Sequence, residues 1–313
     1  MRKMIMLGLA AALAFPGCTG GTAGPVTAAV AGPRVLTVAG TRFELVVQAS
    51  FPGAADRVGP VLWVQVKVRN LADRRLDLPV KLPYELVDAA GHPAPEPDLV
   101  TSQVHLGFDA EHPALPVGPE LTPGETVVGF LAFSPPGAGF TPAAFRFDLD
   151  GPTDWPLAGL PDQPVIEALP PPAGAVEAGQ TVPLTGSGPA GSAAGPLVDA
   201  SVRVRFGQLT DARSADRMPA GYHGVAAPVE ITNVGQHPYR TSTAGLYVFD
   251  TAGRAYRSVP LQLAGALAED QPVPPGRAVR GLVAFAVPDR ATLSHIRFAL
   301  PAGNTHSTAW WTI

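Results

Sequence analysis

The chain has 313 residues, a formal net charge of −4 and only 15% charged residues, and it contains 34 glycines and 36 prolines. This length allows two ordinary domains that each bury a core, and the many turn-forming residues favour a β protein over one built of long helices. The 22 lysines and arginines are scattered along the chain, so the sequence predicts no nucleic-acid partner.

The N-terminus has the pattern of an export signal. Arg2 and Lys3 precede an apolar run from Met4 to Phe15, which is too short to span a bilayer as a stable helix. The sequence therefore predicts an exported protein. Cys18 follows this run and is the only cysteine, so it cannot form a disulfide within the chain.

The segment around Cys18 resembles a bacterial lipoprotein signal peptide, because the small residue Gly17 precedes the cysteine. The resemblance implies that residues 1–18 are the signal, that Cys18 is acylated, and that the lipid anchors the protein to the membrane. Thr19 follows, which by the same resemblance implies the outer membrane if the cell has one. The alternative is cleavage after Ala14, which would give a secreted protein with a free thiol.

Residues 19–33 contain no aromatic residue and are predicted to be a flexible tether between the anchor and the folded part. The first predicted domain spans residues 34–150. Its clearest strand has Leu62, Val64, Val66 and Val68 on one face and Trp63, Gln65, Lys67 and Arg69 on the other. This period of two predicts a half-buried strand with its aliphatic face toward a core.

Residues 151–196 are rich in proline and glycine and are predicted to link the first domain to a second one at 197–313. Gly186 to Gly191 match the dinucleotide-binding pattern G-x-G-x-x-G. Pro189 and the small residues that follow it could not begin the helix that this motif requires, so the match is attributed to chance. Residues 165–169 could pair as a short edge strand.

The two predicted domains repeat one pattern. Asn70, Asp88, Gly91, Pro123, Gly124, Gly129 and Phe133 return in the same order as Asn233, Asp250, Gly253, Pro275, Gly276, Gly281 and Phe285. The spacing between the last three residues of each set is identical. This repetition predicts a tandem duplication, and the shared Asn, Asp, Gly and Pro residues are of the types that form turns and strand ends.

The repeated pattern also predicts one difference between the copies. Aligning Asn70 with Asn233 places Val225, Ala227, Val229 and Ile231 on the apolar face of the second strand. The same alignment places Pro228 where the first copy has Gln65. Because proline cannot donate to a β-ladder, we expect that strand to lie at a sheet edge or to contain a bulge.

Short strands separated by turn signals favour an antiparallel β-sandwich in each copy. A strand that ends in Asn, a strand that ends in Asp-x-x-Gly, and a Pro-Gly turn before Gly-x-x-x-Phe resemble the immunoglobulin-like (telokin-like) domain of uncharacterised bacterial lipoproteins. The resemblance covers both copies. It implies an all-β fold of two tandem immunoglobulin-like sandwiches at the cell envelope.

Common catalytic motifs are absent from the sequence. It contains no His-Glu-x-x-His, Gly-x-Ser-x-Gly, Cys-x-x-Cys or Walker loop, so we expect no enzyme activity and no cofactor. Copper handling is disfavoured because Met218 is the only methionine after the signal. His105, Asp109 and His112 crowd into one segment and are candidate zinc ligands, with a solvated loop as the alternative.

The copies differ in aromatic residues and in charge. Tyr222, Tyr239, Tyr256 and Trp311 lie in the second copy and are candidate partner-binding residues, because Tyr and Trp are enriched at recognition surfaces. The alternative is that they pack in the core. Residues 34–150 contain 9 Lys and Arg residues and 14 Asp and Glu residues, whereas residues 198–313 contain 11 and 8.

These observations predict a non-catalytic, lipid-anchored envelope protein that acts as a binding module. The membrane, through the lipid on Cys18, and an envelope protein or glycan are its expected partners. The alternative is an envelope accessory protein that binds a small ligand or a metal.

Overall fold

The computed structural model describes residues 32–55, 59–77, 84–94, 112–113, 115, 120–134, 139–148, 151–189, 197–212, 218, 220–243, 245–300 and 308–313. Every regular element in these ranges is a β-strand, and nearly all of the strands pair antiparallel, which confirms the predicted all-β class. Within the same ranges, no helix is long and apolar enough to cross a membrane.

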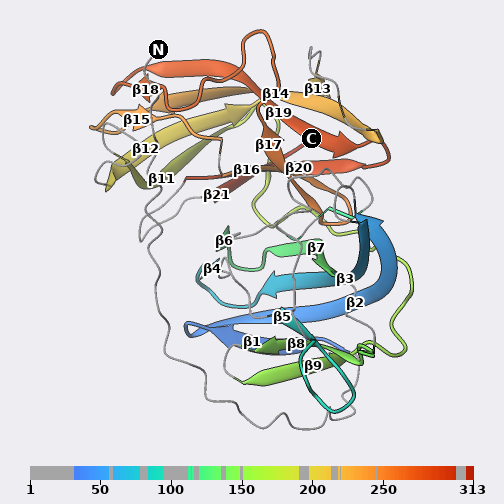
Figure 1. The fold of residues 1–313 in the computed structure, drawn as a ribbon. Coiled ribbons are helices and arrows are strands. Elements are labelled where there is room, and N and C mark those ends of the chain that lie inside the picture. Colours follow the sequence, from blue (N-terminus) through green and yellow to red (C-terminus); the bar gives the residue numbers. More distant parts are fainter. Residues whose placement is uncertain are drawn as a thin grey trace, which may run out of the picture.

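The N-terminal half, residues 34–156, contains two sheets that face each other (Figure 1). The larger sheet has the order β1 (Arg34–Val38), β2 (Thr41–Ala55), β3 (Gly59–Asn70) and β7 (Thr126–Phe133). The smaller sheet has the order β5 (Tyr84–Val87), β8 (Ala144–Asp148) and β9 (Pro152–Pro156). A short ladder joins β4 (Leu76–Asp77) to β6 (Glu120–Leu121).

Alternation along the strands builds the core of this half. Val64, Val66 and Val68 point to one face of β3 and are fully buried, and Phe145 and Trp155 meet them from the opposite sheet in the same cluster. Burying each such side chain contributes roughly 1.5–3 kcal/mol. The core therefore lies between the two sheets, as the period-two pattern predicts.

The C-terminal half, residues 176–313, also has two facing layers. The outer layer contains β11 (Thr181–Pro189), β12 (Leu197–Phe206), β14 (Tyr222–Asn233) and β19 (Ala278–Pro288), with β13 (Thr210–Asp211) on β14. The second layer contains β16 (Leu246–Asp250), β20 (Leu293–Ala299), β21 (Thr308–Thr312) and β10 (Val176–Glu177). β17 (Ala255–Val259) pairs with both layers, and β15 (Tyr239–Arg240) pairs with β18 (Pro272–Val273).

The two repeated asparagines make the same hydrogen bonds. The Asn70 side chain donates to the carbonyls of Arg74 and Leu121 and accepts from the N–H of Ala72, at 2.8–2.9 Å. Asn233 bonds in the same way to equivalent positions. Its partners are His237, Val273 and Gly235. Both asparagines are fully buried, so each one satisfies backbone groups that water cannot reach.

The two Asp-x-x-Gly segments also match. The Asp88 carboxylate accepts from the N–H groups of the second and fourth residues after it, and Asp250 does the same. Gly91 and Gly253 adopt φ values of 84° and 75°, which glycine tolerates best. These segments form the tight turns that their spacing predicts.

The structure places Pro228 inside a sheet rather than at its edge, opposite an interruption of the neighbouring strand where the pairing shifts by one residue. β14 lies inside its sheet, with β19 on one side and β12 and β13 on the other, and its pairing with β19 has no register shift. The β12 ladder ends at Val229 and the β13 ladder begins at Ala226, so Pro228 falls in the gap between them. The Pro228 carbonyl accepts from the Gly207 N–H on that side. Because Pro228 has no ladder partner there, its missing N–H leaves no ladder hydrogen bond unmade.

The range 151–196, expected as a linker, contributes strands to both halves, because β9 pairs with β8 and β11 pairs with β12. Residues 165–169 form no strand but lie on the outer face of β3. There the Gln65 side chain exchanges two hydrogen bonds with the Val165 backbone, and Lys67 pairs with Glu167 at 2.6 Å. Gln65 and Trp63, predicted on the face away from the core, are therefore buried.

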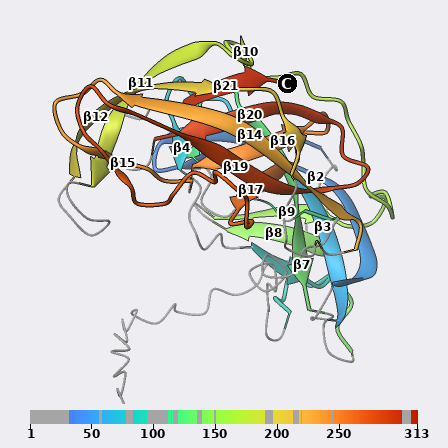
Figure 2. The same ribbon diagram turned by 90° about the horizontal axis from the view of Figure 1, so that it is seen from above.

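The two halves contact each other beside β7, where the strands of the C-terminal half cross those of the N-terminal half (Figure 2). The Val128 N–H donates to the Gly253 carbonyl at 3.0 Å. Just before β7, Glu125 forms an ion pair with Arg297 of β20 at 2.9 Å, with side chains only 2% and 4% exposed. A buried charge pair and a backbone bond thus fix one half on the other.

Candidate functional site

The predicted zinc ligands are only partly within the described residues. His105 and Asp109 lie outside them, as does the predicted lipid site Cys18. The His112 ring stacks on Trp63 with centroids 4.8 Å apart and meets Phe130 edge-on at 5.1 Å. Within the described part of the chain, no three His, Cys, Asp or Glu residues gather as a metal site would require.

The four aromatic candidates for partner binding are buried. Tyr222, Tyr239, Tyr256 and Trp311 are between 0% and 9% exposed. The Tyr256 hydroxyl donates to Asp250 at 2.9 Å, and the Trp311 indole donates to the Gln180 carbonyl at 2.9 Å. Their positions on the strands face the interior, so these residues form no exposed patch. They pack in the core, which is the alternative that the sequence left open.

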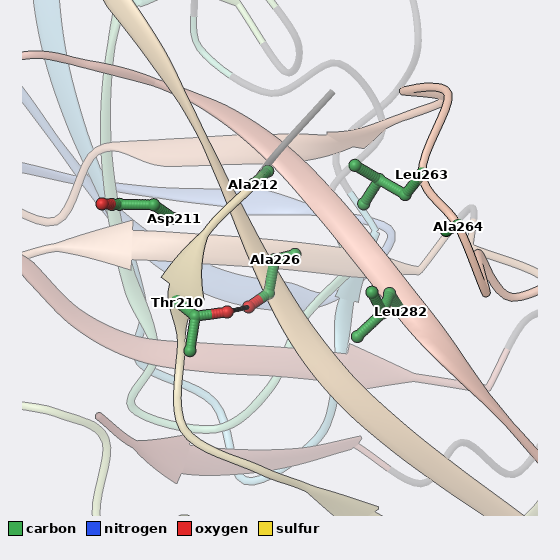
Figure 3. Close-up of a pocket in the computed structure, with 7 residues that line it drawn as sticks. All are labelled: Thr210, Asp211, Ala212, Ala226, Leu263, Ala264 and Leu282. Carbon is green, nitrogen blue, oxygen red and sulfur yellow. Dashed lines mark hydrogen bonds between the residues drawn. The ribbon is translucent and has the colours of Figure 1, made fainter. Parts of the chain in front are cut away.

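A pocket of about 470 Å³ opens on the outer face of the C-terminal half (Figure 3). Its floor is formed by Ala226 of β14 and Leu282 of β19, and Leu263 and Ala264 form one wall. The remaining lining residues are Thr210, Asp211 and Ala212. The Asp211 carboxylate points away from the two leucines, and polar and apolar atoms contribute nearly equally to the lining of the pocket.

The pocket occupies a position that is filled in the N-terminal half. The Leu115 N–H donates to the Phe130 carbonyl, and the Leu267 N–H donates to the Leu282 carbonyl in the same way. Phe130 and Leu282 are therefore equivalent in position. Counting back from Leu115 and Leu267 makes His112 equivalent to Ala264, and counting back from Asn70 and Asn233 makes Trp63 equivalent to Ala226.

The pocket thus exists because smaller side chains replace three rings that pack against one another. In the N-terminal half Trp63, His112 and Phe130 pack together in an apolar cluster. In the C-terminal half two alanines and a leucine stand in their places. The backbone is held by the same hydrogen bonds in both halves, so it does not close in to fill the space.

A row of charged side chains crosses the same sheet face next to the pocket. Arg205 of β12, Glu230 of β14 and Arg280 of β19 are direct cross-strand neighbours. Arg205 and Arg280 donate to different oxygens of Glu230 at 2.9 and 3.0 Å. Because side chains two residues apart share a strand face, Arg280 lies beside Leu282 at a spacing of roughly 7 Å.

The charge of this row is positive, since two guanidinium groups flank one carboxylate. The hydrogen bond from Arg280 has the largest effect and lowers the pKa of Glu230; burial opposes this shift, and the charges of the two arginines add to it. Glu230 is therefore ionised at neutral pH. The arginine side chains are 50% and 75% exposed, so donors on both guanidinium groups are accessible to a ligand.

Sequence reasoning missed this pocket and the charged row beside it. The signal that could have found them is the replacement of Trp63 by Ala226 in the aligned strands, which removes a large side chain from one copy only. Comparisons of the chain with known protein families, with curated proteins and with solved structures give no match.

Proposed function

We propose that the chain is an exported, lipid-anchored cell-envelope protein that acts as a non-catalytic binding module. In this proposal it consists of two tandem immunoglobulin-like sandwiches that arose by duplication. The identical hydrogen bonds of Asn70 and Asn233, and of Asp88 and Asp250, support the duplication. Arg2, Lys3 and the run before Cys18 support export and lipid attachment.

The observation that carries the binding role is the open pocket of the C-terminal half. Its lining consists of aliphatic side chains with one hydroxyl and one carboxylate, and that carboxylate points away from the leucines. Such a surface can enclose an apolar group and orient it, which is the chemistry of recognition. The strands under the pocket are held in place by the continuous pairing of β14 with β19.

The alternative, an envelope accessory protein for a small ligand, is favoured by the size of the pocket. A volume of about 470 Å³ falls within the range of about 300–1,000 Å³ in which small molecules bind. The metal version of this alternative depends on His105 and Asp109, which lie outside the described residues.

Site-specific photo-crosslinking in intact envelopes tests the binding role. The full chain carries a photo-reactive residue in place of Leu263 in the pocket or, as a control, in place of Arg290 in an exposed turn. We expect a discrete adduct with a protein or glycan from position 263 only. Equal adducts from both positions, or a chemically altered partner, would contradict a non-catalytic binding module.

Lipid attachment is tested on the same material by the mass of the mature N-terminus. We expect an acylated Cys18 as the first residue and loss of membrane association in a chain that starts at residue 19 behind a cleavable secretory signal. An unmodified N-terminus at Phe15 would contradict the anchor and leave a secreted protein.

A further inference from the structure

We propose that the pocket binds an aromatic monocarboxylate, with its ring between Leu263 and Leu282 over Ala226 and its carboxylate on Arg205 and Arg280. This proposal rests on the non-catalytic binding role described above and names the ligand of that pocket. Two independent observations carry it. One is the space that the N-terminal half fills with aromatic rings, and the other is the row of arginines beside that space.

The shape of the empty space argues for an aromatic ring. At the equivalent place in the N-terminal half, the Trp63 indole lies nearly parallel to the His112 ring at an interplanar angle of 21° and edge-on to Phe130 at 82°. The C-terminal half keeps the surrounding strands but has Ala226 and Ala264 at the positions of the two stacked rings. A planar ring of the size of an indole therefore fits where the described residues supply none.

The charged row argues for a carboxylate on that ring. Arg205 and Arg280 share Glu230, which leaves one net positive charge and matches a monoanion. Guanidinium donors bind carboxylates through paired hydrogen bonds, and such charge-assisted bonds are about twice as strong as neutral ones. The spacing of roughly 7 Å between Leu282 and Arg280 places the charge one short linker away from the ring.

In the N-terminal half, the corresponding face of β3 is covered by another segment of the same chain. There, Lys67 stands at the position of Glu230 and pairs with Glu167, and Gln65 binds the Val165 backbone. The chain covers its own N-terminal face with these contacts. In the C-terminal half Pro228 replaces Gln65 and is exposed, so the equivalent face is open to a ligand.

Isothermal titration calorimetry with indole-3-acetate tests the proposal. The protein is the chain from residue 19 onward, which keeps every described residue and avoids detergent. Indole and tryptamine serve as matched probes, because they carry the same ring with no charge or with a positive charge. We expect indole-3-acetate to bind at least tenfold more tightly than indole and tryptamine not to bind measurably.

Three variants locate the site. Arg280→Gln and Arg205→Gln are each expected to weaken indole-3-acetate binding about tenfold without changing the affinity for indole, since each removes one charge-assisted contact. Ala226→Trp, which restores the indole of the N-terminal half, is expected to abolish binding of both probes. Arg290→Gln is the control and is expected to bind like the unaltered protein, because this exposed arginine lies in a turn beyond the far end of β19.

Several outcomes would overturn the proposal. These are no heat with indole-3-acetate, binding of tryptamine as tight as that of indole-3-acetate, or unchanged affinity for indole-3-acetate in both arginine variants. Circular dichroism checks that each variant is natively folded. If indole-3-acetate fails while crosslinking from position 263 succeeds, the ligand class is wrong and the binding role stands. If both fail, the proposed function falls as well.

Discussion

Buried polar side chains hold the loops of this protein in place. Asn70 and Asn233 each satisfy three backbone groups where solvent cannot reach, and an unsatisfied buried group costs about 1–3 kcal/mol. These contacts explain why the asparagines recur in the sequence. His295 is a buried polar residue whose protonation links folding to pH.

His295 is 5% exposed and stacks on Phe249 with ring centroids 4.7 Å apart. Burial, with a contribution from the nearby charge of Arg297, lowers the pKa of His295 from 6.5 to about 4. The folded protein therefore binds fewer protons than the unfolded chain between these pH values. Stability should rise by about 3 kcal/mol from pH 4 to pH 6.5 through this group alone and then level off.

Urea denaturation at a series of pH values checks this prediction. His295→Phe keeps the stacked ring but cannot be protonated, so this variant should lose that part of the pH dependence. His237→Gln alters an exposed histidine, and this variant should keep the pH dependence of the unaltered protein. Parallel pH profiles for the unaltered protein and His295→Phe would show that His295 does not carry the effect.

At the scale of strands, two glycines permit a close approach of chain segments. A Cβ on Gly129 would lie 2.3 Å from the Leu115 Cα, and one on Gly281 would lie 2.6 Å from the Leu267 Cα. Both contacts are with backbone, so neither neighbour can move aside cheaply. We expect Gly129→Ala and Gly281→Ala each to reduce the free energy of unfolding by about 1–3 kcal/mol, measured by chemical denaturation.

The second glycine variant should also disturb the pocket. The Leu282 amide donates to the Gly265 carbonyl beside Ala264, so displacing this segment moves one pocket wall. Gly129→Ala is the matched control, because it makes the same change in the half without the pocket. Equal crosslinking at position 263 in both variants would contradict this coupling.

Much of the strand arrangement could be predicted from the sequence, because alternation of apolar residues reports which face of a strand meets a core. Val64, Val66 and Val68 show this. The pattern could not show that Trp63 and Gln65 are buried too, because their cover comes from His112 and Val165, far along the chain. The surroundings of Pro228 could not be predicted for a similar reason, since a gap between two neighbouring strands is a tertiary feature.

The candidate site was harder to predict. Tyr222, Tyr239, Tyr256 and Trp311 suggested a surface by their chemistry, but alternation turns them inward. The pocket exists because Ala226 is small where the N-terminal half has Trp63. A small side chain indicates a pocket only when the equivalent larger residue is known. Composition alone carries no such information.

At the scale of the whole molecule, the pair Glu125–Arg297 holds the halves together. Arg146, at the position equivalent to Arg297, pairs within its own half with Asp154 and Glu85. Arg297 instead has Tyr247 and Trp310 as its cross-strand neighbours. Its carboxylate partner therefore comes from the other half.

Breaking this buried pair should be costly. Glu125→Gln leaves the Arg297 charge buried without its counter-charge, and we expect a loss of about 3–5 kcal/mol in chemical denaturation. Lys67→Met breaks a more exposed ion pair with Glu167 and should cost under about 1 kcal/mol. Adding Arg297→Met to Glu125→Gln should recover much of the loss. A small effect of Glu125→Gln alone would contradict the buried-pair argument.

The bond from Val128 to Gly253 has a consequence for solubility. β7 is the last strand of its sheet, and an uncovered strand edge can pair with a strand of another molecule. The turn at Gly253 occupies that edge at Val128, and the segment around Leu115 occupies it at Phe130. Separating the halves would thus expose a template for intermolecular pairing, so the joint between them also protects the protein from aggregation.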